Sequence, residues 1–292
     1  MCAETYNTCS RATNEIEAGA MSPSPPTAPH VIPGETGVNS VASLDDHVYV
    51  ARNHKKDVEV YDAVTLTLER RLSVPGISRT VAGLAACARN KCLYLSDWNS
   101  PGIHRVDLAT DAVKRWPVAK EPRCLSINRD HNLLVACLAD DKLQEFTTGG
   151  CLVREICLAA GVGSPCHAIQ LSTGDYLVSQ WKSPGVVSIV GEDGGLLRSY
   201  GLARSHIGPL KCPRCLAVTK HGDILIADGG NHRIVAINCW RTRACLLPLP
   251  ADIELTAPSS VCLDETRDRL YIGEMWGKFR VIVVNNLSNI SW

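Results

Sequence analysis

The dominant pattern along the chain is a short aliphatic run followed by a polar turn rich in Gly, Pro, Asn and Asp. The segment DILIADGGNHRIVAIN at 223–238 is typical, because one apolar run ends in an acid, turns on two glycines and resumes as a second run. Such runs around a Gly-containing connection predict a β-hairpin. The chain shows no helical periodicity of about 3.6 residues. The pattern therefore predicts an all-β protein.

The first strand of this hairpin is one of six similar segments along the chain, which we call anchor strands. They are VYVAR at 48, LYLSD at 93, LLVAC at 133, YLVSQ at 176, ILIAD at 224 and LYIGE at 270. The fourth residue of each is small: Ala51, Ser96, Ala136, Ser179, Ala227 and Gly273. A small residue at one repeated place indicates a crowded contact repeated around an axis. Units of about 40–50 residues with four short antiparallel strands are typical of propeller blades.

We therefore predict a six-bladed β-propeller of four-stranded antiparallel blades at 28–292, behind a flexible tail at 1–27. The blades are expected near 38–76, 81–120, 122–161, 165–201, 213–250 and 258–287. The sixth unit lacks a fourth strand, and the segment APHVIPG at 28–34 precedes the first unit without belonging to it. We expect this N-terminal segment to supply the missing outer strand and close the ring, where an edge position tolerates its prolines.

The fifth unit, LAVTKHGDILIADGGNHRIVAIN, resembles the NHL repeat through Asp228, Asn231, His232 and Arg233. The second unit keeps part of the pattern in SDWNSPGIHRV, and the other four are degenerate. The chain as a whole resembles the NHL propeller at the C-terminus of tripartite-motif ubiquitin ligases. This resemblance implies a structural role for the motif residues and a recognition role for the propeller, with RNA binding and ubiquitination as associated properties. Ligase activity is not expected of this chain, since no RING, B-box or coiled coil precedes the propeller.

Composition narrows the class further. The 30 basic and 30 acidic residues cancel, so the net charge identifies no partner. No apolar run is long enough for a membrane helix, and the N-terminus lacks signal-peptide features. The 14 cysteines are therefore expected to be reduced thiols of a cytoplasmic, monomeric protein.

Aromatic and basic residues gather in the loops that join second to third strands and in those that join blades. We expect these loops to share one face of the ring, which we call the loop face. Its candidate ligand-binding residues are Trp98, Trp181, Trp276, Lys55, Lys56, Lys182, Lys278, Arg123 and Arg214. Basic residues exceed acidic ones in these loops. The face suits an acidic protein or peptide, or single-stranded RNA, whose bases stack on aromatic rings. The alternative is a solvated rim with its Trp side chains packed between blades.

One position near the start of each innermost strand is expected to face the axis. These positions, the axial column, are Ser40, Gly83, Cys124, His167, Cys215 and Ser260. Cys124, His167 and Cys215 are weak candidates for a zinc site, since thiolate and imidazole are zinc ligands. The same column lacks the carboxylates of calcium-dependent gluconolactonase-type hydrolases, the alternative function. We therefore expect no cofactor, no catalytic residues and a non-catalytic interaction module.

Overall fold

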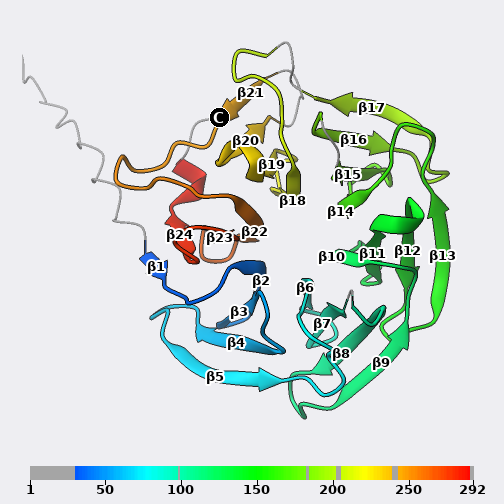
Figure 1. Cartoon of the computed structure of the whole chain (residues 1–292), viewed down its shortest axis with the longest axis vertical. Coiled ribbons are helices and arrows are strands. Elements are labelled where there is room, and N and C mark those ends of the chain that lie inside the picture. The colour runs from blue at the N-terminus through cyan, green and yellow to red at the C-terminus, as the bar shows by residue number, and fades with distance from the viewer. Residues whose placement is uncertain (1–29, 98, 182–183, 202–204, 239–242, 290–292) are drawn as a thin grey trace, which may run out of the picture.

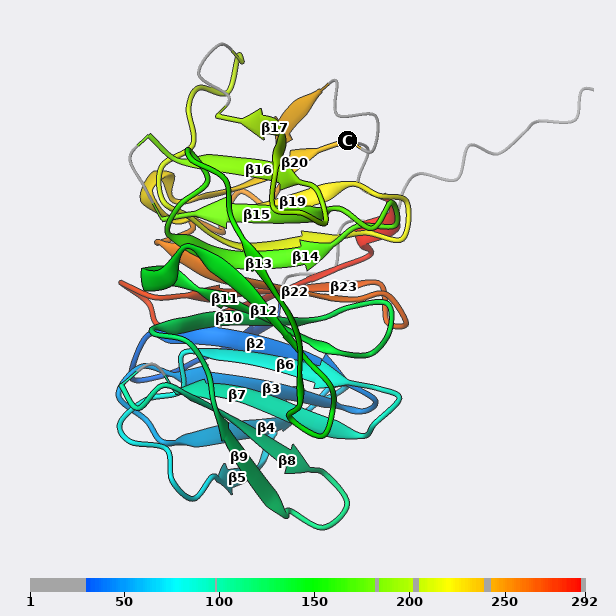
Figure 2. The same ribbon diagram turned by 90° about the vertical axis from the view of Figure 1, so that its right-hand side faces the viewer.

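The computed structural model describes residues 30–97, 99–181, 184–201, 205–238 and 243–289. Six four-stranded antiparallel sheets surround a central axis, as Figure 1 shows. The innermost strand of each blade faces the axis, and the outermost strand lies at the rim (Figure 1). Turned edge-on in Figure 2, the ring carries its loops on two opposite faces. The predicted six-bladed all-β propeller is confirmed.

The strands of the first three blades follow the chain from the axis to the rim. Blade one is β2 Val38–Leu44, β3 His47–Arg52, β4 Asp57–Asp62 and β5 Leu68–Ser73. Blade two is β6 Gly83–Cys87, β7 Cys92–Asp97, β8 Gly102–Asp107 and β9 Val113–Pro117. Blade three is β10 Pro122–Ile127, β11 Leu133–Cys137, β12 Lys142–Phe146 and β13 Leu152–Cys157.

The remaining blades repeat this order, except that the last borrows its outer strand. Blade four is β14 Pro165–Gln170, β15 Tyr176–Gln180, β16 Val186–Val190 and β17 Leu196–Tyr200. Blade five is β18 Pro213–Val218, β19 Ile224–Asp228, β20 Arg233–Ile237 and β21 Ala244–Leu246. Blade six is β22 Pro258–Asp264, β23 Arg269–Glu274, β24 Val281–Asn285 and the N-terminal strand β1 His30–Ile32.

The N-terminal strand closes the ring, as the sequence predicted. β1 pairs antiparallel with β24, with Val31 opposite Ile282. Arg52, at the end of β3, is buried behind this junction and donates to the carbonyl oxygens of Pro33 at 2.9 Å and Phe279 at 3.0 Å. Its Nε also lies 2.5 Å from the carboxylate of Glu59. One side chain thus joins blade one, blade six and the closing segment.

The anchor strands lie at the centre of each blade and are almost fully buried. The small position of each is packed against the next blade, and Ala51 and Ala227 have no exposed surface. A Cβ atom on Gly273 would come within 2.5 Å of Val38 in the neighbouring blade. The prediction of a crowded contact at this position is therefore correct.

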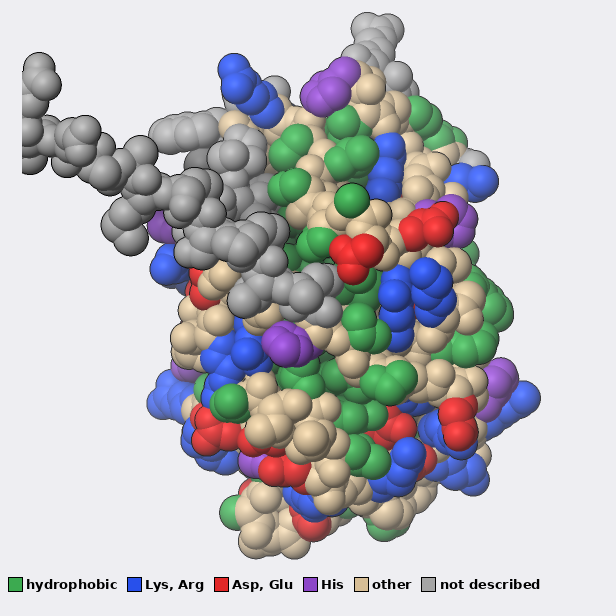
Figure 3. All heavy atoms as spheres, turned by 90° about the vertical axis from the view of Figure 1, so that its left-hand side faces the viewer, with side chains coloured by type: hydrophobic (Ala, Val, Ile, Leu, Met, Phe, Trp, Pro, Cys, Tyr) green, Lys and Arg blue, Asp and Glu red, His purple; other side chains and the backbone are tan. Residues whose placement is uncertain are grey.

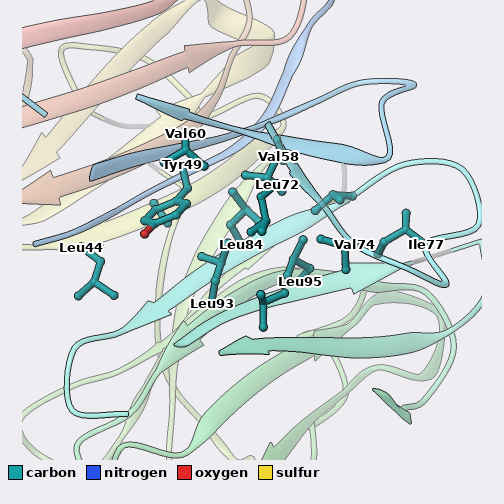
Figure 4. Close-up of a cluster of buried hydrophobic side chains, with 14 residues drawn as sticks. Leu44, Tyr49, Val58, Val60, Leu72, Val74, Ile77, Leu84, Leu93 and Leu95 are labelled. Atoms are coloured by element: carbon teal, nitrogen blue, oxygen red, sulfur yellow. The ribbon is translucent and has the colours of Figure 1, made fainter. Parts of the chain in front are cut away.

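Aliphatic side chains fill the spaces between adjacent blades. Figure 4 shows one such cluster, in which Tyr49, Val58 and Leu72 of blade one meet Leu84 and Leu95 of blade two. Full burial of an aliphatic side chain contributes roughly 1.5–3 kcal/mol, so these clusters hold the blades together side by side.

Basic and acidic side chains are interspersed on the side of the ring that Figure 3 shows. No helix in the described residues is long and apolar enough to cross a membrane. Each cysteine in the described ranges is a free thiol.

Candidate binding site at the mouth of the axial channel

Four of the six innermost strands begin with the same local backbone conformation. A residue with positive φ precedes a proline, as at Glu121 before Pro122 and Cys212 before Pro213. The pairing with the anchor strand then shifts register between Pro122 and Leu125, and between Pro213 and Leu216. Such an irregularity interrupts the strict alternation of a strand. Two successive residues of each strand can therefore line the axis.

The first residue of each pair forms a ring around the mouth of the channel. We call this the upper ring: Asn39, Ala82, Arg123, Cys166, Arg214 and Ser259. All six line one cavity of ≈ 410 Å³, together with Trp181, Trp276 and neighbouring loop residues. The second residue of each pair belongs to the axial column, and four members of that column line a separate cavity of ≈ 270 Å³ deeper in the channel. We call the upper cavity the mouth pocket.

An aromatic ring and two guanidinium groups form one wall of the mouth pocket. The Arg123 guanidinium lies 4.8 Å from the centre of the Trp181 ring, and that of Arg214 lies 4.5 Å from it. Arg123 comes from blade three and Arg214 from blade five, on either side of the blade that carries Trp181. A guanidinium over an indole ring is attracted by the π electrons of the ring. Trp181 therefore holds two positive charges close together, although they repel one another.

The small fourth residues of the anchor strands also fix the backbone of both arginines. The hydroxyl of Ser96 donates to the carbonyl oxygen of Arg123 at 2.7 Å, and that of Ser179 donates to the carbonyl oxygen of Arg214 at 3.1 Å. Gly83 allows blade three to approach, since a Cβ there would lie 2.5 Å from the Arg123 carbonyl oxygen. Preorganised positions of this kind reduce the ordering cost when a ligand binds.

The electrostatics of the mouth pocket favour an anion. None of its described lining residues is Asp or Glu. Burial lowers the pKa of Arg123, because removal from water disfavours the charged guanidinium. Arginine presents a planar fork of donors that suits carboxylate and phosphate groups. The arrangement can thus bind an anionic group between two arginines.

The structure divides the nine candidate residues of the loop face. It brings Arg123, Arg214, Trp181 and Trp276 to the mouth pocket, where the Trp276 side chain is 56% exposed at the rim. Lys55 lines a different cavity, beside the closing segment. Lys56 and Lys278 are exposed and do not line the mouth pocket, and Trp98 and Lys182 lie outside the described residues.

The NHL motif of blade five forms a hydrogen-bonded loop. The buried carboxylate of Asp228 accepts from the backbone N–H of Lys211, the amide of Asn231 and Nε of Arg233, each at 2.7 Å. The Arg233 guanidinium also donates to backbone carbonyl groups of residues 207–209. His232 has a positive φ, and its Nδ1 accepts from the N–H of Ala257 in the connection to blade six. These contacts are all internal to the chain and join the loop to both neighbouring connections.

Two of the degenerate blades, one and six, replace this motif with related ion pairs. Glu274 of blade six accepts from Thr256 N–H at 2.7 Å and from Nε of Arg280 at 2.9 Å, which repeats the geometry of Asp228 and Arg233. Blade one places Arg52 where blade five has the acid. Sequence reasoning missed both pairs, although the acid at the end of LYIGE was a usable signal for Glu274.

The axial column is used for contacts between blades. His167 accepts from Leu216 N–H through Nδ1 at 3.0 Å, and its Nε2 lies 3.2 Å from the Leu125 carbonyl oxygen. These two bonds correspond to the neutral imidazole with the proton on Nε2. Ser40 and Ser260 likewise accept from backbone N–H groups of the next blade. Cys215 lies 3.6 Å from the His167 ring.

The weak zinc candidates therefore meet a geometric obstacle, because both nitrogens of His167 are engaged in the bonds between blades. In the described part of the chain, no group of three or more His, Cys, Asp or Glu side chains is arranged to hold a metal ion. What sequence reasoning missed is Cys166, which precedes His167 and enters the mouth pocket. Strict alternation along the strand would have placed Cys166 away from the axis. The proline at 165, which precedes the register shift, was the signal in the sequence that could have revealed its true position.

Comparison with known proteins supports the repeat and the fold. Residues 210–237 match the NHL repeat, a stretch that contains the Asp228 loop. A search of curated proteins finds no significant match. The resemblance to tripartite-motif ligases stays a prediction, which these comparisons do not show.

Several solved structures share the fold at low sequence identity. Virginiamycin B lyase from Staphylococcus aureus superimposes with a TM-score of 0.63 at 9% identity, over 88% of this chain and 98% of that one. Hydrazine synthase from Kuenenia stuttgartiensis has a TM-score of 0.64 at 14% identity, over 87% of this chain and 97% of that one. A chain of a nidogen–laminin complex has a TM-score of 0.66 at 17% identity, over 82% and 90%. These similarities show a common propeller fold, and residues 210–237 carry the NHL repeat within it.

Proposed function

We propose that this propeller is a non-catalytic binding module that recognises an acidic segment of a protein or peptide partner at the mouth pocket. The observation that carries the proposal is the pair of guanidinium groups on Trp181, in a pocket without an acidic residue in its described lining. Arg123 and Arg214 supply the positive charge, Trp181 positions them, and the exposed Trp276 supplies apolar contact at the rim.

The energetics favour an anionic ligand. Two positive charges held together in a partly buried pocket repel each other, and a carboxylate between them removes that repulsion. Hydrogen bonds to charged groups contribute roughly 1.5–3 kcal/mol each. One carboxylate bound by both arginines can therefore anchor a short peptide, and contact with the rim adds to the affinity.

The geometry favours a peptide over single-stranded RNA. Recognition of unpaired bases depends on aromatic rings whose faces are free for stacking. The two guanidinium groups already lie over the Trp181 ring. Lys55 lines a separate cavity, so these lysine and arginine residues do not form one continuous track for a phosphate backbone.

The residues of the axis support binding more than hydrolysis. A metal-dependent hydrolase needs oxygen or imidazole ligands that converge on a cation and a water molecule. The one histidine of the axial column instead bonds to backbone groups of blades three and five. The lyase similarity at 9% identity concerns the fold and lends no catalytic residues to this chain.

Selection from a displayed peptide library tests the proposal. The library is selected on the wild-type chain and depleted on the Arg123→Gln/Arg214→Gln double variant. We expect enriched peptides to carry Asp or Glu. Each single arginine variant should weaken their binding roughly tenfold to hundredfold, which corresponds to the loss of one charged hydrogen bond.

The matched control is Arg89→Gln, because Arg89 is exposed on a turn of the opposite face. It should bind as the wild type does. Enriched peptides without acidic residues, or equal binding by the arginine variants, would refute the proposal. Tighter binding of an oligouridylate, with a salt dependence of about −0.7 per phosphate contact, would assign the face to nucleic acid instead.

A further inference from the structure

Three thiols from adjacent blades meet along the axial channel. Each of them lies within the first three residues of an innermost strand, Cys124 in β10, Cys166 in β14 and Cys215 in β18. Cys124 and Cys166 both line the mouth pocket, and Cys124 also lines the deeper cavity. Small molecules that enter the mouth pocket from the loop face therefore reach two thiols at its floor.

Positive charge surrounds the Cys166 thiol. In the upper ring, Cys166 lies between Arg123 of one neighbouring blade and Arg214 of the other. The pKa of Cys166 is lowered, first by the neighbouring Cys124 thiol and then by the two guanidinium charges, in opposition to its burial. The pKa of Cys124 is raised, chiefly by its interaction with Cys166. The pKa of Cys215 is lowered as well, chiefly by Cys124, but Cys215 lines the deeper cavity and not the mouth pocket. Of the two thiols that line the mouth pocket, Cys166 is thus the nucleophile, since the thiolate is the reactive form.

We propose that Cys166 and Cys124 form a peroxide-sensitive thiol pair that closes to a disulfide between blades three and four. The Cys166 thiolate attacks one oxygen of hydrogen peroxide, the O–O bond breaks, and a sulfenic acid forms with hydroxide as the leaving group. The Cys124 thiol then attacks the Cys166 sulfur and loses its proton. The S–O bond breaks, the S–S bond forms, and the hydroxyl leaves as water. Peroxide is reduced, and the two thiols are oxidised.

The disulfide would change the mouth pocket directly. Arg123 immediately precedes Cys124 in the chain, and Cys166 lines the same wall as Trp181. A bond between the two sulfurs would draw β10 and β14 together near their N-terminal ends, beside both arginines. This reactivity belongs to the free chain and does not depend on the identity of any partner, so it goes beyond the binding role proposed above.

The test is residue-resolved mass spectrometry after treatment of the reduced, folded chain with substoichiometric hydrogen peroxide. We expect a loss of two hydrogen atoms and a peptide that links Cys124 to Cys166. The internal control is the Cys87 and Cys92 pair, whose residues are opposite each other across β6 and β7 and are both buried. Burial raises the pKa of Cys92, so this pair should oxidise later.

Alkylation provides a second measurement that does not require a disulfide. Iodoacetate carries a carboxylate and iodoacetamide does not, so the two arginines should favour iodoacetate at Cys166. We expect this preference to exceed that at the exposed Cys151 by about tenfold, equivalent to about 1.4 kcal/mol. It should fall in an Arg214→Gln variant.

The outcomes are decisive. In Cys124→Ser, peroxide should stop at the sulfenic acid of Cys166, and in Cys166→Ser the linkage should be absent. Earlier oxidation of Cys87 and Cys92 would overturn the proposal. A disulfide from Cys124 to Cys215, or a Cys166 that is inert to peroxide and shows no preference for iodoacetate, would overturn it equally.

Discussion

The Arg52 side chain offers a direct test of how the ring is closed. Arg52 is 2% exposed and pairs with Glu59 at 2.5 Å. It also donates to carbonyl oxygens of Pro33, Thr36 and Phe279, on both sides of the closing segment. The change Arg52→Met keeps much of the side-chain volume and removes the charge and all of these donors. We expect the ring to loosen at this junction.

The expected loss in the free energy of unfolding depends on the partners that Glu59 keeps in the Arg52→Met variant. Removal of one member of a buried ion pair costs roughly 3–5 kcal/mol. Glu59 retains Arg71 at 3.0 Å and the Tyr61 hydroxyl at 2.9 Å, and a cavity of ≈ 340 Å³ beside it can admit water to the carbonyl groups. The loss should therefore lie near the lower limit, at about 3 kcal/mol. For a chain of this size, that lowers the melting temperature by about 6–12 °C.

Urea unfolding followed by tryptophan fluorescence measures the loss. The matched control is Arg71→Met, since Arg71 contacts the same carboxylate from solvent with its side chain 49% exposed. It should lose less than about 1 kcal/mol. The double variant Arg52→Met/Glu59→Leu should recover part of the stability, because it removes the buried carboxylate that the single variant leaves without its buried partner. If Arg52→Met unfolds at the same urea concentration as Arg71→Met, Arg52 does not hold the closure and the reasoning is wrong.

Two further predictions concern the interior of the blades. Ala227→Leu should cost roughly 1–3 kcal/mol in urea unfolding, because Ala227 has no exposed surface and lies against the next blade; an unchanged midpoint would contradict the packing described here. The pKa of the buried His104 is lowered, chiefly by burial and then by Arg115, although Asp97 acts in the opposite direction. Below the ordinary histidine pKa of about 6.5, His104 therefore binds more protons in the unfolded chain than in the folded chain. The contribution of neutral His104 to the free energy of unfolding is complete above that pH and decreases below it. His104→Leu should flatten this dependence between about pH 7 and pH 5, and an equally steep profile in the variant would rule out His104 as its source.

The local pattern of apolar runs and polar turns in the sequence was sufficient to predict most of the architecture. Alternating runs and Gly-containing turns report on residues that are close in the chain, and each blade is built from such hairpins. The small column from Ala51 to Gly273 indicated the repeated contact between blades. The missing strand of the sixth unit indicated ring closure by the segment that contains β1, because an open ring would leave exposed edges.

The site was predictable only in part. Trp181, Arg123 and Arg214 were candidates from the sequence because basic and aromatic residues gather in the two classes of loop that make up the loop face. Their meeting in one pocket depends on contact between three blades, for which local sequence carries no signal. The same ring geometry separates Lys55 from them, although Lys55 lies in the same class of loop as Trp181.

The sequence by itself determined that this chain folds as six similar hairpin-rich units, because strand periodicity and turn chemistry act over a few residues. The tertiary structure decided which side chains share the axis. The proline-led irregularity at the start of β14 brings Cys166 into the mouth pocket, and the blades on either side supply Arg123 and Arg214. Alternation along a strand cannot predict this placement, because the irregularity interrupts it and the neighbours are distant in sequence.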